Sequence, residues 1–301
     1  MKILLAVSGG IDSMYMAEKF SRTARPEDLA VAHCNFGLRG EESDGDEEFV
    51  KDWCNKHGIE CFVQHFETED YASRHNVSIE MAARDLRYGW FADVCRKGGF
   101  EAVAVAHNAN DNAETLILNL LRGTGGRGLR GMKAEGTVPG APDVKLLRPL
   151  LETSREEIVG FMTAEGLGWR EDRTNADTIY KRNKIRNEVF PLFREINPSF
   201  LRTFSREMKH FSQENDIAER YFQSCALPSL EEGVNVRELM KNDCWEWLLY
   251  RLCEPYGLSE ETFDKLVGLL SSGRTISGKV FQAPSWVLYI KGKILKASPR
   301  V

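Results

Sequence analysis

A short apolar run at the start of the chain, followed at once by a glycine turn, constrains the fold more than any other feature. Residues 3–7 (Ile-Leu-Leu-Ala-Val) indicate a strand buried on both faces, as in a parallel sheet. The turn Ser8-Gly9-Gly10-Ile11-Asp12-Ser13 comes next, and residues 14–20 are typical of a helix. In such a strand–turn–helix unit, unpaired backbone N–H groups and the helix dipole converge on an anion. The sequence therefore predicts an α/β fold with an anion site at the end of its first strand.

This turn differs from the two common phosphate-binding loops. No lysine follows the glycines, as GxxxxGK[ST] requires, and the GxGxxG pattern is absent. One alternative is that Gly9 and Gly10 serve the turn alone, because glycine accepts backbone angles that other residues resist. Asp12 instead indicates a site that binds a phosphate together with a cation. A carboxylate repels a nearby phosphate unless a cation such as Mg²⁺ lies between them. The pattern SGGxDS resembles the pyrophosphate loop of the N-type ATP pyrophosphatases, and the resemblance implies that residues 8–13 bind ATP.

Strand and helix patterns alternate through the first part of the chain, which predicts a Rossmann-like parallel sheet covered by helices on both faces. The expected strands are residues 3–7, 29–35, 59–66, 101–107 and 145–151, and the expected helices are residues 41–57, 78–97, 111–122 and 153–165. Ser78 and Thr153 are the expected N-caps of two of these helices. Ligands of open parallel sheets bind beyond the carboxyl ends of the strands. Ser8, His33 and His107 lie at such ends and should face one crevice.

The alternation stops near Pro198, where we place a boundary between a catalytic domain, residues 1–198, and a second domain, residues 199–301. Helical patterns follow at residues 199–225, 236–254 and 259–270, and alternating apolar and polar residues at 277–297 indicate a hairpin or meander. The second domain is thus expected to be smaller and mostly helical. Within the first, residues 123–133 carry too many glycines for a fixed element, and residues 172–180 are polar and loop-like.

Composition excludes several classes of protein. With 42% hydrophobic and 28% charged residues, the 301-residue chain is typical of a soluble globular protein of about two domains. Seven cysteines without regular spacing or a CxxC pair argue against disulfides, zinc ribbons and iron–sulfur clusters, and favour the cytoplasm. No run approaches the ~20 apolar residues of a membrane helix, so no membrane partner is expected. A net charge of -5 gives no overall sign of nucleic acid binding. The sequence leaves open whether the chain forms a homodimer.

Two kinds of charged group stand out. Asp111 and Glu114 are three residues apart at a helix start, so they can hold one cation or ammonium group; helix capping explains them equally well. Arg84 and Arg87 share a face of an earlier helix and can clamp a phosphate or form surface ion pairs. A further cationic group flanks the Gly-rich segment without interleaved acids, which favours contact with an RNA backbone. Its members are Arg122, Arg127, Arg130, Lys133, Arg148, Arg182, Lys184 and Arg186.

The order of these motifs resembles the tRNA(Ile)-lysidine synthetase family across residues 2–198. The matching segments are residues 8–13, HCNFGLR at 33–39, ARDLRY at 83–88, His107 with Asp111 and Glu114, RGTG at 122–125, GLRGM at 128–132, RPLL at 148–151 and RNKIR at 182–186. The resemblance implies an adenine nucleotide α-hydrolase-like fold and a ligase that joins free L-lysine to the wobble cytidine of tRNA(Ile) with a CAU anticodon. ATP and Mg²⁺ adenylate the cytidine with release of pyrophosphate, and lysine then displaces AMP. Phe36, Asn110 and Asn112 depart from the family's usual residues.

The resemblance also implies roles for single residues. Asp12 and Asp111 are expected to hold Mg²⁺. Asp111 and Glu114 are expected to bind lysine, with Asp111 as the best candidate for the base that frees its amine. The remaining assignments are His33 for ATP, Arg84 and Arg182 as catalytic contacts to the cytidine or a phosphate, and Arg87, Arg122, Arg127, Arg130, Lys133, Arg148 and Arg186 for tRNA.

Other functions remain open on the sequence. A tRNA thiolase of the same superfamily would need a persulfide cysteine or a cluster site; Cys34 and Cys95 are present, but no CxxC pair is. A non-catalytic nucleotide- or RNA-binding relative would have no need of Asp12 or of the Asp111–Glu114 pair. A small-molecule ATP pyrophosphatase is disfavoured by the basic segment at 123–133.

Overall fold

The computed structural model describes residues 1–171, 181–272 and 276–300, and the chain divides into two compact units, Met1–Ser212 and Gln213–Val301. Each unit has a hydrophobic core of its own. The long helix α10 (Phe200–Ser224) runs through the division. The functional boundary after residue 198 therefore stays a proposal, and the expected loop at 172–180 lies outside the described residues.

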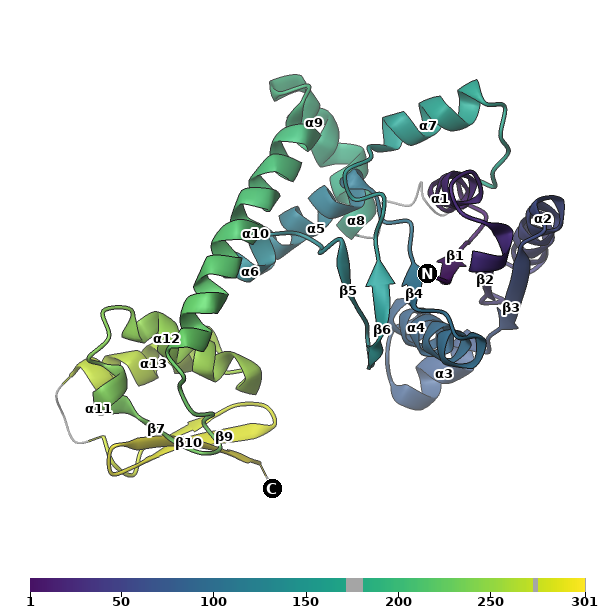
Figure 1. Cartoon of the computed structure of the whole chain (residues 1–301). Coiled ribbons are helices and arrows are strands. Elements are labelled where there is room, and N and C mark those ends of the chain that lie inside the picture. The colour runs from purple at the N-terminus through teal and green to yellow at the C-terminus, as the bar shows by residue number, and fades with distance from the viewer. Residues whose placement is uncertain (172–180, 273–275, 301) are drawn as a thin grey trace. The chain divides into compact units, whose positions relative to one another are not determined.

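A six-stranded sheet forms the centre of the first unit (Figure 1). The strands are β1 (Ile3–Ala6), β2 (Leu29–Asn35), β3 (Glu60–His65), β4 (Ala102–Ala104), β5 (Glu135–Val138) and β6 (Ala141–Leu147). Their order is β3-β2-β1-β4-β6-β5, with parallel pairing throughout except that β5 is antiparallel to β6. The predicted α/β class is confirmed. The hairpin partner β5 was missed because this short, mostly exposed edge strand has no apolar run.

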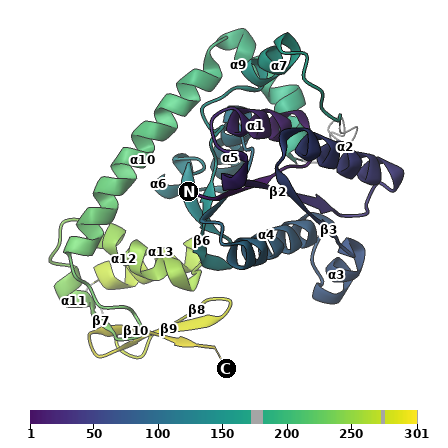
Figure 2. The same cartoon turned by 45° about the vertical axis from the view of Figure 1, so that its right-hand side comes forward.

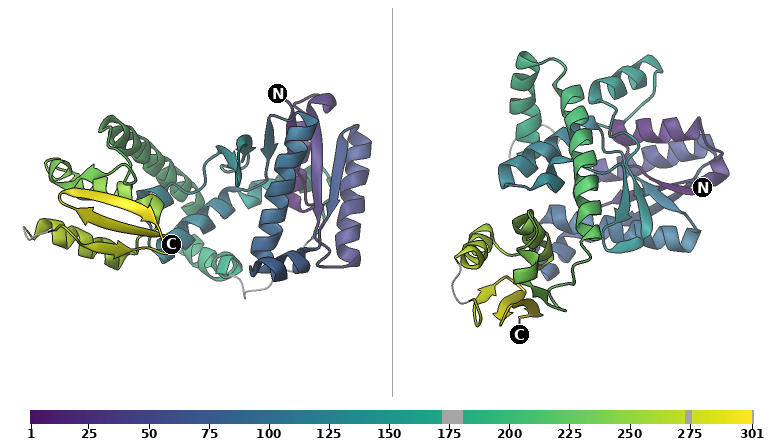
Figure 3. Two further views of the ribbon diagram at one scale, coloured as in Figure 1. Left: turned by 90° about the horizontal axis from the view of Figure 1, so that it is seen from below. Right: turned by 60° about the vertical axis from the view of Figure 1, so that its left-hand side comes forward.

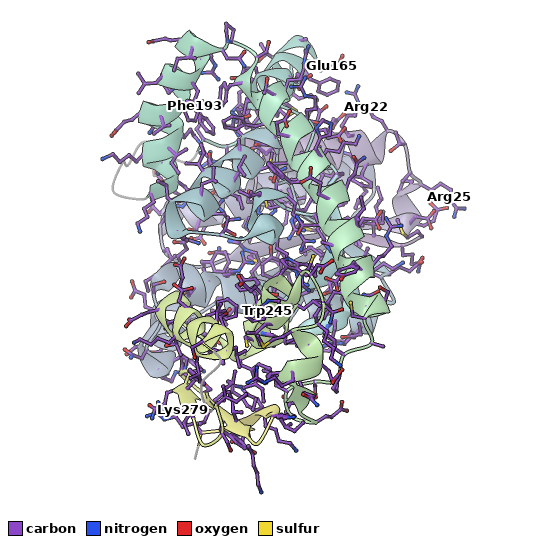
Figure 4. The ribbon with its side chains drawn as sticks, turned by 90° about the vertical axis from the view of Figure 1, so that its left-hand side faces the viewer. Arg22, Arg25, Glu165, Phe193, Trp245 and Lys279 are labelled. Atoms are coloured by element: carbon purple, nitrogen blue, oxygen red, sulfur yellow. The ribbon has the colours of Figure 1, made fainter. Side chains whose placement is uncertain are left out.

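Helices cover both faces of this sheet, as predicted (Figure 2). Ile3 and Leu5 of β1 pack with α1, α2 and α7, whereas Leu4, pointing to the other face, packs with α4. Arg22 and Glu165, at the C-terminal ends of α1 and α7, form an ion pair of 3.0 Å (Figure 4). The helical elements are α1 (Ile11–Ser21), η1 (Pro26–Asp28), α2 (Glu41–His57), α3 (Thr68–His75), α4 (Ile79–Gly98), α5 (Ala109–Arg122), α6 (Gly126–Leu129), α7 (Arg155–Ala164), α8 (Lys181–Lys184), η3 (Ile185–Val189) and α9 (Phe190–Ile196).

The Gly-rich segment is more regular than expected. It contains the short helix α6, and two asparagines of α5 bind it. Asn119 Nδ2 donates to the Gly128 carbonyl at 3.0 Å, and Asn112 Oδ1 accepts the Met132 N–H at 2.7 Å. The expectation that residues 123–133 form no fixed element was wrong, because these side-chain amides satisfy backbone groups that would otherwise need water.

Helix α7 begins one residue later than predicted. Its N-cap is Ser154, not Thr153: Ser154 Oγ accepts the Glu157 N–H at 3.2 Å, and the Glu157 carboxylate accepts the Ser154 N–H at 2.7 Å. The sequence is ambiguous here because Thr153 with Glu156 and Ser154 with Glu157 both match the capping-box spacing. Only the reciprocal hydrogen bonds of the fold distinguish them.

We expect Ser154→Ala to lower the melting temperature by about 2–4 °C, because loss of such a cap costs about 1 kcal/mol. Thr153→Ala is the matched control and should shift the transition much less, since Thr153 bonds Leu150 and Ala109 through its backbone. Calorimetric unfolding of both variants measures the difference. Equal shifts would contradict the assignment of the cap.

The second unit combines helices with a four-stranded antiparallel sheet of order β7-β10-β9-β8, whose long strands are yellow in Figure 3. Beyond α10 its elements are β7 (Val234–Asn235), α11 (Val236–Leu239), α12 (Trp245–Cys253), η4 (Glu254–Tyr256), α13 (Glu260–Ser271), β8 (Val280–Gln282), β9 (Trp286–Lys291) and β10 (Ile294–Pro299). The helix predicted at 236–254 is divided, because Asn242 and Asp243 favour a turn. Within the described ranges, no helix is long and apolar enough to cross a membrane.

Candidate active site

The turn after β1 is built around Gly9 and Ser13. Gly9 has a φ of 92°, in the region that favours glycine. Ser13 Oγ accepts the Ser8 N–H at 3.1 Å and donates to the Gly10 carbonyl at 2.8 Å. Gly10 is the N-cap of α1 and provides no side-chain cap, so the first N–H groups of the helix stay available. This geometry suits the binding of a phosphate.

A cavity of about 600 Å³ opens beside this turn, a size that suits a nucleotide. The carboxyl ends of β1, β2 and β4 all contribute to it, which confirms that the strand ends face one crevice. Asp12, His107 and Arg155 line its polar side. An apolar wall consists of Ala32, Cys34, Phe91 and Val105.

His33 does not line this cavity, although its neighbours Ala32 and Cys34 do. Successive strand residues point to opposite faces, and His33 is buried beneath the turn. Its Nδ1–H donates to the Val7 carbonyl at 2.9 Å, and burial lowers the pKa of its imidazole. The structure therefore gives His33 a supporting position under the turn at residues 8–13, without direct access to the cavity.

Hydrogen bonds join Asp12 to the start of α5. Asp12 accepts from Arg155 Nη1 and, at 3.0 Å, from Asn108 Nδ2. Asn108 is the N-cap of α5 and forms a capping box with Asp111, in which each backbone N–H donates to the other side chain at 3.0 Å. Asp111 is thus fixed by the helix cap and connected to Asp12 through a single residue.

Asp111 and Glu114 share one guanidinium. Arg186 Nη2 lies 2.7 Å from Glu114 Oε1 and 3.3 Å from Asp111 Oδ1. The Glu114 side chain is 0% exposed, and burial raises the pKa of its carboxyl although Arg186 opposes this. Its Oε2 is buried and has no partner among the described residues. The two carboxylates thus lie together as their spacing predicted, but Arg186, which the sequence assigned to tRNA, is bonded to them.

Asp12 and Asp111 are the two carboxylates that would hold a magnesium ion together with phosphate oxygens of a substrate. Burial raises the pKa of Asp12, Arg155 and Asn108 lower it, and the charge of Asp111 raises it further, so the two carboxylates act on each other. Mg²⁺ commonly takes one or two carboxylates together with phosphate oxygens and water. Over residues 1–171, 181–272 and 276–300, no group of three or more His, Cys, Asp or Glu could form a closed protein cage for a metal.

Comparison with known proteins identifies the family of the chain. Residues 1–193 match the PP-loop domain family. A tRNA(Ile)-lysidine synthase of Petrotoga mobilis is 33% identical over 298 residues, which are 96% of this chain and 92% of that protein. The chain belongs to the tRNA(Ile)-lysidine synthase family. The family member of Bacteroides thetaiotaomicron is 36% identical over 95% of this chain, and the chain spans 64% of that relative's length.

A solved structure shows the same fold. The U34-tRNA thiolase NcsA from Methanococcus maripaludis, described with its [4Fe-4S] cluster, matches with a TM-score of 0.56 at 19% identity. The match covers 70% of this chain and 72% of that one. At this identity the similarity establishes the PP-loop architecture alone.

His107, which the lysidine synthase resemblance placed in its motif, lies in a strongly positive environment. Burial and the guanidinium groups of Arg148, Arg182 and Arg87 lower its pKa to about 4, against the effect of Asp111. Its Nδ1 is buried without a partner in the described part of the chain. The imidazole is therefore neutral at physiological pH and can donate or accept one hydrogen bond.

The other predicted arginines and lysines form two groups. Arg84, Arg87, Arg148 and Arg182 contact aromatic rings, a backbone carbonyl or a hydroxyl, and an outer set surrounds α6. Arg87 lines the cavity with its guanidinium 5.3 Å from the Phe36 ring centre, and Arg84 lies 5.0 Å from that of Tyr88. Burial lowers the pKa of Arg148, whose Nη1 donates to the Lys133 carbonyl at 2.9 Å. Arg182 reaches Thr115 Oγ1 at 3.4 Å. The outer set consists of the exposed Arg122, Arg127 and Lys133 and the half-buried Arg130.

Two residues that depart from the lysidine synthase pattern have structural roles. Asn110 Oδ1 accepts the Arg155 N–H at 3.0 Å, which fixes the start of α7 where Arg155 reaches Asp12. Asn112 binds the Gly-rich segment through Met132. Both amide oxygens accept backbone N–H groups.

The sequence did not reveal one wall of the cavity. Trp169, Arg170 and Glu171 line it, and the Arg170 N–H donates to the Gly9 carbonyl at 2.9 Å. Asp46 of α2 accepts from Arg170 Nε at 2.9 Å and thereby holds this segment against the turn. Arg155 was also missed. No local signal marks these residues, because their partners lie far away in the sequence.

Proposed function

We propose that the chain is a cytoplasmic tRNA(Ile)-lysidine synthase, which uses ATP to join L-lysine to C2 of the wobble cytidine of tRNA(Ile) with a CAU anticodon. The observation that carries this proposal is the line of hydrogen bonds from Asp12 through Asn108 and Asp111 to Arg186 and Glu114. It joins an anion site to a pair of carboxylates within one polar network. A reaction in which ATP first activates the cytidine and an amine then attacks it needs both the anion site and the carboxylates.

In the first step, the cytidine O2 attacks the α-phosphorus of ATP and the bond to pyrophosphate breaks. The N–H groups at the start of α1, with the Ser8 hydroxyl, are suited to the charge on the departing phosphates. Mg²⁺ held by Asp12 and Asp111 would neutralise part of that charge. Arg87 and Arg155 line the same cavity and add positive charge to it.

In the second step, the ε-amine of lysine attacks C2, the C2–O2 bond breaks, and AMP leaves with the oxygen. An ammonium group cannot attack, so a base must first take its proton. Two observations support Glu114 over Asp111 for this role. Burial raises the Glu114 pKa and its Oε2 is without a partner among the described residues, whereas Asp111 Oδ2 already accepts the Asn108 N–H. Asp111 then serves to position the amine.

The outer cations support a path for RNA. Arg122, Arg127 and Lys133 lie around α6 with exposed, positively charged side chains. Phosphate contacts of this kind position a nucleic acid, while base contacts specify it. We assign the outer set to the tRNA backbone. We assign Arg87, which lines the cavity, to the anticodon together with Arg84 and Arg182.

The proposal is tested by pyrophosphate release from ATP and Mg²⁺ with an unmodified tRNA(Ile) transcript, with and without L-lysine, followed by mass analysis of the anticodon nucleoside. We expect release to depend on the tRNA and the cytidine to gain lysine. Pyrophosphate release without lysine incorporation would support the adenylation step and indicate a nucleophile other than lysine. Pyrophosphate release that does not depend on tRNA would contradict an RNA substrate. No release at all would indicate a non-catalytic relative.

The rival tRNA thiolase makes a different demand on Cys34, the one cysteine that lines the cavity within the described residues. Thiolase chemistry needs a reactive thiolate, but burial raises the pKa of Cys34 to about 12. We expect Cys34→Ala to change tRNA-dependent pyrophosphate release by less than about threefold, or about 0.7 kcal/mol of activation free energy. Loss of product formation in this variant, with ATP binding kept, would favour the thiolase.

A further inference from the structure

Arg186 closes off the two carboxylates that the proposed function assigns to lysine. Its Nε donates to Glu114 Oε1 at 2.8 Å and its Nη2 also reaches Asp111. The Arg186 side chain is 37% exposed, whereas Glu114 is 0% exposed. A cation that arrives from solvent therefore meets a guanidinium already in place at Glu114 Oε1.

A wide helical turn puts Arg186 there. In the π-helix η3 the Phe190 N–H donates to the Ile185 carbonyl, five residues earlier. Pro191 lacks an N–H and its ring conflicts with the carbonyl four residues back, which disfavours a regular α-turn. The wide turn lets the neighbours Ile185 and Arg186 both face α5: Ile185 packs in the apolar cluster with Ala113, and Arg186 binds the carboxylates. Such turns are frequent at functional sites.

We propose that Arg186 occupies the position of the substrate's primary ammonium group in the protein without RNA, and that lysine binds there once Arg186 has left. This inference rests on the proposed function, because it takes Asp111 and Glu114 as the lysine site. A second cation beside the guanidinium would be repelled by it. Equally, departure of the guanidinium leaves Glu114 as a buried charge without a partner, which favours the entry of the lysine ammonium group. The two cations exchange.

RNA offers Arg186 another partner. The arginine fork binds phosphate through two hydrogen bonds, and phosphate contacts fix the position of a bound RNA. Arg182, one turn earlier in the same helical segment, contacts α5 through a long hydrogen bond to Thr115 Oγ1, 3.4 Å. Both side chains can thus turn from α5 to phosphates when tRNA binds. We therefore expect tRNA to bind before lysine.

Equilibrium dialysis with radiolabelled L-lysine, in the absence of ATP, tests this exchange. Without RNA, we expect Arg186 to be away from the carboxylates in fewer than about one molecule in ten. Because only those molecules can bind lysine, Arg186→Gln should bind it at least about tenfold more tightly than the unsubstituted protein. Addition of the tRNA(Ile) transcript should bring the unsubstituted protein toward the affinity of the variant. A gain in affinity is a result that a merely supporting role for Arg186 would not give.

Lys184→Gln is the matched control, because it removes one positive charge from the same helical segment at a residue paired with Glu188, 3.8 Å away. In the absence of RNA, Lys184→Gln should bind lysine as the unsubstituted protein does. Equal or weaker lysine binding by Arg186→Gln would overturn the exchange. If circular dichroism shows that this variant does not fold, Arg186→Lys replaces it: an ammonium lacks the fork and competes less, so lysine affinity should still rise, and an unchanged affinity would overturn the proposal.

The failure of this inference can be told from failure of the proposed function. If the unsubstituted protein binds lysine with tRNA and a non-hydrolysable ATP analogue, but Arg186→Gln gains nothing, only the exchange is wrong. If the unsubstituted protein binds no lysine even with both present, the lysine-ligating function fails with it.

Discussion

We expect the Asp12→Asn variant to release pyrophosphate from ATP about 10²–10³ times more slowly than the unsubstituted protein, because it loses charge stabilisation of the departing phosphates. Asparagine keeps the shape of the side chain and an oxygen for the Asn108 amide, but it cannot serve as an anionic ligand to Mg²⁺. Steady-state pyrophosphate release with saturating tRNA measures the effect.

The same variant should not be less stable. Burial raises the pKa of Asp12, so the folded protein disfavours the ionised form relative to the unfolded chain, and this cost is present at pH values above the raised pKa. A neutral amide avoids the cost, so the melting temperature at pH 7 should stay the same or rise. Asp143→Asn, which removes an exposed carboxylate paired with Arg96 at 2.8 Å, is the control and should keep full activity. A rate for Asp12→Asn close to that of Asp143→Asn would contradict the role of Asp12.

The Glu114→Gln variant should separate the two proposed steps. We expect tRNA-dependent pyrophosphate release to continue, while kcat/KM for lysine falls by about 10²–10³, or about 3–4 kcal/mol, the cost of removing one partner from a buried charged pair. Glutamine fills the same space beside Arg186 but neither neutralises an ammonium nor takes its proton. Mass analysis should therefore find adenylated cytidine or its hydrolysis products in place of lysidine.

A matched control is available on the helical segment that carries Arg186. Glu188→Gln removes an exposed carboxylate from that segment and should leave both steps unchanged, since Glu188 pairs with Lys184 and not with the site. If Glu114→Gln lost pyrophosphate release and lysine incorporation equally, with an unchanged melting temperature, Glu114 would belong to the first step as well.

Local signals were sufficient for much of the fold. The apolar run at 29–35 became β2 with the same bounds, because a buried parallel strand is an uninterrupted apolar segment between turn residues. Ser78 caps α4 as predicted, with its side chain accepting the Met81 N–H at 3.2 Å. Asp111 and Glu114 share a helix face for the same reason, since their spacing alone fixes it. These features depend on residues a few positions apart.

The parts of the site that the sequence did not reveal depend on distant residues. Asp12 and Arg155 are 143 positions apart, and nothing near either residue indicates the other. Arg170 meets Gly9 only because the segment after α7 returns to the first turn. Arg186 stands in a basic run, and composition placed it with the solvent-exposed cations. The fully buried Glu114 is what draws it inward, and burial cannot be derived from a charge pattern.

The wide turn at η3 also makes the length of this segment matter more than the identity of most of its residues. Loss of Asn187 or Glu188 would remove the extra residue of the wide turn, and each residue of a helix adds a rotation of about 100°. Every side chain before the deletion would then turn by about that angle relative to α9. Arg182 and Arg186 would both leave α5, although no arginine had been substituted. Point changes would be tolerated at many positions of this segment, whereas a one-residue deletion would remove two functional groups at once.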